Sequence, residues 1–211
     1  MRYLTFIIIL FFSLNSDAQG VTGGIRVGAD IASQTFGSER EGQTDWKTGF
    51  LAGVSRDHDF GNQFHMLSDL IWIMKGTRSR DDATRTKGVT TLNYIELDLL
   101  GKFEFSNEKE NGLFVTFGPT LGYFLGGRIK NTQEGVEISN DKVSGEALDR
   151  RFEFGGAAGV GFDLNNWILE FRGQLGLTSI DSGGQVKNAV ISAHFSRYFN
   201  LQKEDKEPIQ E

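Results

Sequence analysis

The chain of 211 residues contains no cysteine, and this absence excludes two common devices of exported proteins. Without a thiol there is no attachment point for a lipid at an N-terminal cysteine, and no disulfide can staple a small secreted domain. The fold must therefore be stabilised by its own hydrogen-bond ladder or by its own core.

Proline is almost as scarce, with two residues against 27 glycines, and phenylalanine dominates the aromatics. Such a composition suits a protein built from many strands. Beyond the first 18 residues, no apolar run approaches the roughly 20 residues that a membrane helix requires, which excludes a helical membrane protein. Membrane strands need apolar residues only at alternate positions, so modest overall hydrophobicity does not exclude a membrane β-protein.

Positive charge is also in short supply, with 22 Lys and Arg against 28 Asp and Glu. A protein that binds nucleic acid presents a clustered basic surface, and this sequence has none. We therefore expect no nucleic acid partner.

The first 18 residues have the pattern of a secretory signal peptide. Arg2 supplies a positive charge, Leu4 to Leu14 form an apolar stretch, and small residues, Ser16 and Ala18, precede the expected cleavage point. We predict a signal peptide over 1–18, one domain over 19–199 and a charged periplasmic tail over 200–211.

Eight segments of the expected domain alternate apolar and polar residues, as half-buried strands do. In the clearest of them, Asn93 to Phe105, Ile95, Leu97, Leu99, Phe103 and Phe105 fall on one face, and Glu96, Asp98, Lys102 and Glu104 fall on the other. The eight predicted strands are Thr22 to Ala32, Thr48 to Phe60, Gln63 to Gly76, Thr91 to Phe105, Gly112 to Gly127, Arg151 to Leu164, Asn166 to Thr178 and Lys187 to Phe199.

The connections alternate between long and short. The segments Ser33–Lys47, Thr77–Thr90 and Arg128–Arg150 are long and polar, whereas Gly61-Asn62, Ser106–Asn111 and Asn165-Asn166 are short, and Ser179–Val186 is intermediate. The pattern predicts an all-β fold, an eight-stranded antiparallel up-and-down transmembrane β-barrel in the outer membrane of a Gram-negative cell. Its short turns and both termini would be periplasmic and its longer loops extracellular.

The alternation places apolar residues toward lipid and charged residues in the lumen. Two features depart from it, because Ile71 and Ile73 face inward and Arg197 faces outward near the end of the last strand. An eight-stranded barrel is only wide enough for side chains to fill it, so mixed inward charges favour an ion-paired plug over a pore. The predicted lumen charge network comprises Arg26, Asp30, Asp69, Lys75, Glu96, Asp98, Lys102, Glu170 and Arg172.

Candidate catalytic and metal-binding patterns are weak. The histidines His58, His65 and His194 lack the spacing of metal ligands, and none is expected near the outer rim, where a barrel enzyme would act. The glycine-rich run from Gly155 to Gly161 lacks the Lys-Ser/Thr of a phosphate loop and lies inside a predicted strand. We predict no catalytic residue, no metal and no cofactor.

An ordered series of short motifs carries a resemblance to a known family. The motifs are Asn93-Tyr94-Ile95-Glu96-Leu97, Phe117-Gly118-Pro119-Thr120-Leu121-Gly122-Tyr123, Gly159-Val160-Gly161, Leu169-Glu170-Phe171-Arg172 and Gly176-Leu177-Thr178. Together they resemble the PorT-type outer membrane β-barrel family of Bacteroidetes. The resemblance implies a β-barrel fold and a location in the outer membrane. The founding member of that family is linked to protein secretion, so the resemblance also implies a role in secretion as one possibility.

The expected function is that of a non-enzymatic structural or interaction element in contact with outer membrane lipid. Its expected partners are proteins of a secretion machinery or other envelope proteins. Two alternatives stay open: a barrel enzyme acting on lipid or peptide, and a soluble periplasmic barrel that binds a small ligand. The last alternative would require the faces to be reversed, with apolar residues inside.

Overall fold

The computed structural model describes residues 20–35, 44–61, 63–81, 84–105, 111–144, 151–179 and 186–200. The predicted signal peptide lies outside the described residues, and so does the predicted tail except for Asn200, the last residue of the last strand. Within the described ranges, no helix has the length and apolar character needed to cross a membrane.

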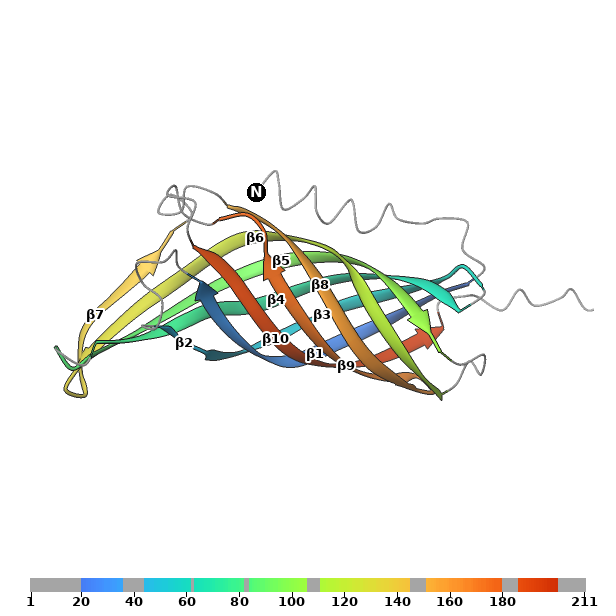
Figure 1. Ribbon diagram of the computed structural model, residues 1–211, viewed down its shortest axis with the longest axis horizontal. Helices are drawn as coiled ribbons and strands as arrows, with labels where there is room; N and C mark the ends of the chain where they lie inside the picture. Colours follow the sequence, from blue (N-terminus) through green and yellow to red (C-terminus); the bar gives the residue numbers. More distant parts are fainter. Residues whose placement is uncertain are drawn as a thin grey trace, which may run out of the picture.

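Ten β-strands make up the described structure (Figure 1). They are β1 (Gly20–Thr35), β2 (Thr44–Asp45), β3 (Lys47–Asp59), β4 (Phe64–Asp81), β5 (Thr86–Glu104), β6 (Asn111–Gln133), β7 (Val136–Val143), β8 (Phe152–Leu164), β9 (Trp167–Gly176) and β10 (Lys187–Asn200).

Eight of these strands close into a ring through antiparallel pairing. The order is β1, β3, β4, β5, β6, β8, β9 and β10, and β10 returns to pair with β1. Each ring strand pairs with its neighbours along the chain, as in an up-and-down barrel. The predicted fold class is therefore confirmed.

The two ends of the barrel differ. At one end, which we call the turn end, lie the connections between β3 and β4 and between β8 and β9, together with the start of β1 and the end of β10 (Figure 1). The turn between β8 and β9 is as tight as predicted, with Asn165 at a φ of 57°. At the other end, which we call the sheet end, several strands run on past the ring.

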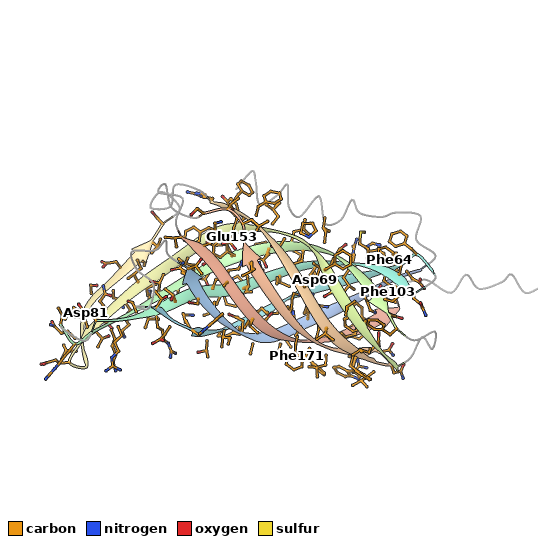
Figure 2. The ribbon with its side chains drawn as sticks, viewed as in Figure 1. Phe64, Asp69, Asp81, Phe103, Glu153 and Phe171 are labelled. Atoms are coloured by element: carbon orange, nitrogen blue, oxygen red, sulfur yellow. The ribbon has the colours of Figure 1, made fainter. Side chains whose placement is uncertain are left out.

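The extended strands form what we call the protruding sheet, made of residues 76–81, 86–92, 126–133 and 136–143 with the short strand β2. β4, β5 and β6 continue beyond the ring, and β7 pairs with β6 along its outer part (Figure 1). Figure 2 places Asp81 at the far tip of this sheet.

The protruding sheet corrects the prediction of three long polar loops. The predicted loop Thr77–Thr90 is mostly strand, the predicted loop Arg128–Arg150 contains the end of β6 and all of β7, and Ser33–Lys47 contains β2. In the hairpin between β6 and β7, Glu134 and Gly135 have φ of 50° and 88°, values that suit a two-residue hairpin turn. These polar segments form strands because their backbone groups pair with one another. They do not separate a lipid-facing side from a lumen-facing side, so the alternation that marks the wall strands does not reveal them.

The side chains alternate across the barrel wall as the sequence predicted. On β1, Ile25 and Val27 are exposed on the outer wall, whereas Arg26 and Asp30 are buried inside. On β9, Phe171 projects from the outer wall (Figure 2). Large apolar residues outside and charged residues inside are typical of a barrel that spans a membrane.

Both departures from the alternation are present as predicted. Ile71 and Ile73 are buried inside, where they pack in a cluster with Leu51, Leu92 and Phe124. Arg197 is exposed on the outer wall of β10, with its guanidinium 4.7 Å from the centre of the Trp167 ring. This contact supports the extended arginine side chain along an aromatic surface at the turn end.

Candidate functional site

The centre of the lumen holds two arginines among three carboxylates. Arg26 Nη1 lies 2.9 Å from Asp69 Oδ2 and 2.8 Å from Glu170 Oε2. Arg172 lies 2.8 Å from Asp69, 2.7 Å from Asp98 and 2.9 Å from Glu170. These side chains come from β1, β4, β5 and β9, so the ion pairs cross the lumen and link strands that are not neighbours in the ring.

Hydroxyl groups complete the central cluster. Thr116 Oγ1 donates to Glu170 at 2.7 Å, and Arg26 Nη2 donates to the Tyr198 hydroxyl at 3.4 Å. Gly159 makes room for this arrangement, because a Cβ there would lie 2.8 Å from Glu170 Oε1 and 2.7 Å from Thr116 Oγ1. A buried charge requires such partners, since an unpaired one costs several kcal/mol.

A second cluster lies around Lys75 toward the sheet end. Its ammonium lies 2.6 Å from Glu96 Oε2 and 2.7 Å from Glu153 Oε1, and Asn188 Nδ2 donates to Glu153 Oε2. The same ammonium lies 5.1 Å from the centre of the Tyr94 ring. Figure 2 labels Glu153 and Asp69, which mark the second and the central cluster along the barrel.

A third cluster surrounds Lys102 at the turn end. Lys102 Nζ lies 2.6 Å from Glu104, 3.1 Å from Asp57 and 3.5 Å from Asp163. His65 Nδ1 lies 2.8 Å from Asp57. Buried Leu67 and Leu100 pack together between this cluster and the central one.

The structure brings eight of the nine residues of the predicted lumen network into these three clusters and leaves Asp30 apart. Both carboxylate oxygens of Asp30 are buried without a hydrogen-bond partner in the described structure. The Asp30 carboxylate occupies the space left by the missing side chain of Gly49 on the neighbouring strand, since a Cβ there would lie 2.8 Å from Asp30 Oδ2. Asp30 is thus in the lumen but not hydrogen-bonded to the network.

The predicted network lacked several partners that the structure supplies. Asp57, Asp163 and Glu153 accept from its lysines, Tyr198 accepts from Arg26, and Asn188 donates to Glu153. The alternation along Arg151 to Leu164 predicts that Glu153 faces inward with glycines 155, 159 and 161, and Glu153 is indeed buried, although its pairing with Lys75 was not predicted. Which charges meet depends on the stagger between strands, which the sequence does not reveal.

The histidines form no metal site in the described part of the chain, where no group of three or more His, Cys, Asp or Glu could hold an ion. His65 lies at the turn end, and His194 is buried with Nε2 at 2.7 Å from Ser192 Oγ and Nδ1 at 3.5 Å from Arg26. His58 is buried, and neither ring nitrogen has a hydrogen-bond partner in the described structure.

The protruding sheet is the second candidate site. Its outermost long strand, β7, pairs with β6 on one side, and the described residues provide no strand on its other side. Val136 and Ile138 on β7 are apolar and are 68% and 54% exposed. Ion pairs hold the hairpin: Lys130 lies 2.6 Å from Glu137, and Arg85 lies 3.1 Å from Glu134. Hydrogen bonds from Lys130 and Asn140 lower the pKa of Glu137 below its usual value.

A closed antiparallel barrel with an apolar outer wall and an ion-paired interior defines the class of transmembrane β-barrels. Residues 16–182 match the model of the family described as outer membrane protein beta-barrel domain. The chain belongs to this family and is an outer membrane β-barrel protein. Among curated proteins, the sequence search found no match.

Several solved structures are similar to this chain at low sequence identity. Neisserial surface protein A is 12% identical with a TM-score of 0.50, over 86% of this chain and 100% of that chain. The attachment invasion locus protein Ail of Yersinia pestis is 13% identical with a TM-score of 0.45, over 85% and 99% of the two chains. OprG of Pseudomonas aeruginosa is 12% identical with a TM-score of 0.45, over 87% and 98%. At such identities the likeness concerns the fold alone.

Proposed function

We propose that this protein is a non-enzymatic anchor that holds the protruding sheet outside the outer membrane as a docking surface for another envelope protein. The observation that carries the proposal is the open edge strand β7, with exposed Val136 and Ile138, on a sheet that continues from the barrel wall. An unpaired strand edge offers a row of backbone donors and acceptors to a partner strand. In this proposal the turn end and both termini of the barrel face the periplasm.

The filled lumen supports an anchor over a transporter. The three ion-pair clusters and the packed leucines between two of them occupy the interior of the barrel. A substrate crossing the lumen would have to break buried ion pairs, and breaking one costs about 3–5 kcal/mol. The protein's surfaces, and not its interior, are therefore the better candidates for function.

The two alternatives find less support in the geometry. His65 lies at the turn end and His194 is enclosed in the lumen, so neither reaches the sheet end, where a barrel enzyme would act on outer substrates. A barrel that carries a small apolar ligand needs an apolar interior, and the interior here is charged.

A role as an accessory to protein secretion belongs to the same proposal. It is supported by the series of motifs that resembles the PorT-type family. In this role, the docking surface on β7 would be the place where the partner protein binds. The partner would be a component of the secretion machinery or an exported protein with a strand available for pairing. The resemblance also suggests an origin in Bacteroidetes, and the residue pattern of 1–18 supports an N-terminal signal peptide there.

Crosslinking and affinity capture from native outer membranes test the docking surface. The variant Val136→Asp with Ile138→Asp puts two charges on β7, and the control Lys87→Asp lowers the net charge by the same amount elsewhere on the protruding sheet. We expect the β7 variant to lose a specific partner that the wild type and the control retain. Equal capture by all three proteins would overturn the proposal.

A further inference from the structure

A cleft of about 670 Å³ opens on the outer surface where the barrel wall passes into the protruding sheet. Met74 and Leu125 form part of its apolar lining, and Arg128, Lys142 and Arg151 supply three cationic side chains. A lining that is apolar on one side and cationic on the other suits an amphiphile with an anionic head.

Two of the cations stand directly opposite each other. Arg128 on β6 pairs with Lys142 on β7, and both side chains are exposed. Like charges in this position destabilise a strand pair. Neither side chain makes a hydrogen bond or a close ion pair with another described residue, and the one nearby carboxylate in the electrostatic range of Arg128, Glu137, is already paired with Lys130. Lys130, on the same strand as Arg128, does have an acidic partner in Glu137. An anion in the cleft would relieve the repulsion.

The cleft lies immediately beyond a layer of aromatic residues on the outer wall. Trp72 packs edge-on against Phe50 with ring centres 5.6 Å apart, and Tyr123 packs against Phe152 at 5.2 Å. Met74, two residues after Trp72 on β4, lines the cleft. Because tryptophan and tyrosine mark the boundary between lipid tails and headgroups, the cleft lies at the level of the headgroups.

Gly126 leaves part of the cleft open. The Asn93 side chain donates to the Gly126 carbonyl oxygen at 3.2 Å and fixes the backbone there. A Cβ on Gly126 would meet no atom closer than the Val143 carbonyl oxygen at 3.9 Å. On the remaining wall, Arg151 Nη1 donates to the Tyr123 hydroxyl at 3.3 Å, which positions that guanidinium beside the aromatic layer.

We propose that this cleft binds a phosphate group of lipid A, the phosphorylated glycolipid of the outer leaflet. A phosphate monoester carries a charge between −1.5 and −2 near neutral pH and accepts several charge-assisted hydrogen bonds, which matches the three cations. Met74 and Leu125 contact the first carbons of an acyl chain, so a lipid and not free phosphate is the ligand. The choice of the outer leaflet rests on the proposed orientation of the barrel.

The test is a titration of purified full-length protein in detergent micelles with lipid A, with the bound lipid counted by native mass spectrometry. The charge variant is Arg128→Ala with Lys142→Ala, and the filling variant is Gly126→Leu, which leaves all three cations in place. The matched control is Arg85→Ala with Lys87→Ala, which also removes two cations, one from the turn between β4 and β5 and one from the start of β5, neither of which lines the cleft. Heat-dependent gel mobility establishes that each variant is folded.

We expect the charge variant and the filling variant each to weaken lipid A binding by roughly tenfold or more, as the loss of charge-assisted contacts predicts. The Arg85/Lys87 control should bind as the wild type does. Lipid A without its phosphates should bind as poorly to the wild type as intact lipid A binds to the charge variant. Phosphatidylglycerol, a phosphodiester, should bind more weakly than lipid A.

Three results would overturn the proposal: wild-type affinity in both cleft variants, equal binding of dephosphorylated lipid A, or equal binding of phosphatidylglycerol. Micelles offer lipid to both ends of the barrel, so the titration does not depend on the orientation. The Val136/Ile138 variant retains the cleft and should bind lipid A normally. Failure of lipid binding and failure of partner docking are therefore distinguishable.

Discussion

At the scale of single residues, Arg172 has the densest set of ion pairs in the described lumen, with Asp69, Asp98 and Glu170 all within 2.9 Å. The change Arg172→Ala leaves Asp69 and Glu170 with Arg26 and removes the ion pair that Asp98 makes in the described lumen. We expect the free energy of unfolding to fall by about 3–5 kcal/mol, as for other broken buried pairs. Urea titration in lipid vesicles measures it.

The matched control for Arg172 is Arg85→Ala, which removes an arginine whose ion pair with Glu134 is exposed. Exposed pairs contribute about 0–1 kcal/mol, so this variant should unfold almost as the wild type does. Similar losses in the two variants would mean that the lumen pairs are not the stabilising contacts that their burial indicates.

Gly159 and Gly173 provide a second residue-scale contrast, between the inside and the outside of the wall. A Cβ at Gly159 would press on Glu170 and Thr116, whereas a Cβ at Gly173 meets no atom closer than 4.0 Å. Gly159→Ala should destabilise the fold by about 1–3 kcal/mol through overpacking, and Gly173→Ala should change it little. The same urea titration compares them, and the reverse ranking would contradict the assigned faces.

Leu99 tests the outer wall. It lies on β5 between Asp98 and Leu100, which are buried inside, and it packs with Leu97 in a cluster on the outer side. An arginine facing lipid near the middle of the membrane costs about 2–4 kcal/mol, so Leu99→Arg should lower stability by that amount. Val136→Arg on the exposed strand β7 is the control and should be tolerated. Equal tolerance at both positions would mean that Leu99 does not face lipid.

At the scale of elements, the eight ring strands were predictable, and their observed ends lie within a few residues of the predicted ones except where strands extend. The reason is that a wall between lipid and a polar lumen imposes strict alternation, as in Ile25 to Asp30. β7 was not predictable by this criterion, because Val136 to Val143 lies outside the wall and has no such faces to separate. Its one available signal was Glu134-Gly135, a two-residue turn between segments read as loop.

For the lumen, too, one part was predictable from the sequence and another was not: the direction of each side chain was, and its ion-pair partner was not. That Glu170 and Arg172 point inward follows from their positions on β9, since alternation fixes the face of every residue in a strand. That Arg172 reaches Asp98, 74 residues earlier in the chain, follows from closure of the ring and from its stagger. Alternation along one strand carries no information about stagger, so the inward residues were predictable and their partners were not.

Hydrogen exchange distinguishes the protruding sheet from the wall. Among the residues that the structure describes, β7 pairs only with β6 and lies outside the ring, whereas β8 pairs with both β6 and β9. Amides of β7 should therefore exchange much faster than those of β8, because unpaired and solvated strands open at low free-energy cost. Mass spectrometry of the protein in lipid nanodiscs measures both peptides. Equal protection would indicate that another strand already covers the β7 edge.

At the scale of the whole molecule, the closure of the strand ring and the filling of the lumen by side chains have separate consequences. Closure removes the free strand edges within the membrane and makes the barrel resistant to unfolding. Filling places Arg26 and Arg172 across the lumen, where they tie β1 and β9 to β4 and β5. The barrel is therefore rigid and its interior is filled. The surfaces that other molecules can contact are the protruding sheet, the outer wall and the turn end.

Conductance tests the filled lumen directly. Pure protein in planar bilayers should show no steady current, because the ion pairs leave no continuous path for water. The double variant Arg26→Ala with Arg172→Ala removes both central guanidinium groups and lets water reach the carboxylates that remain. If this variant still shows the heat-dependent gel shift of a closed barrel, it should conduct small cations where the wild type does not. Reproducible single-channel steps from the wild type would refute the plug and make transport the leading function.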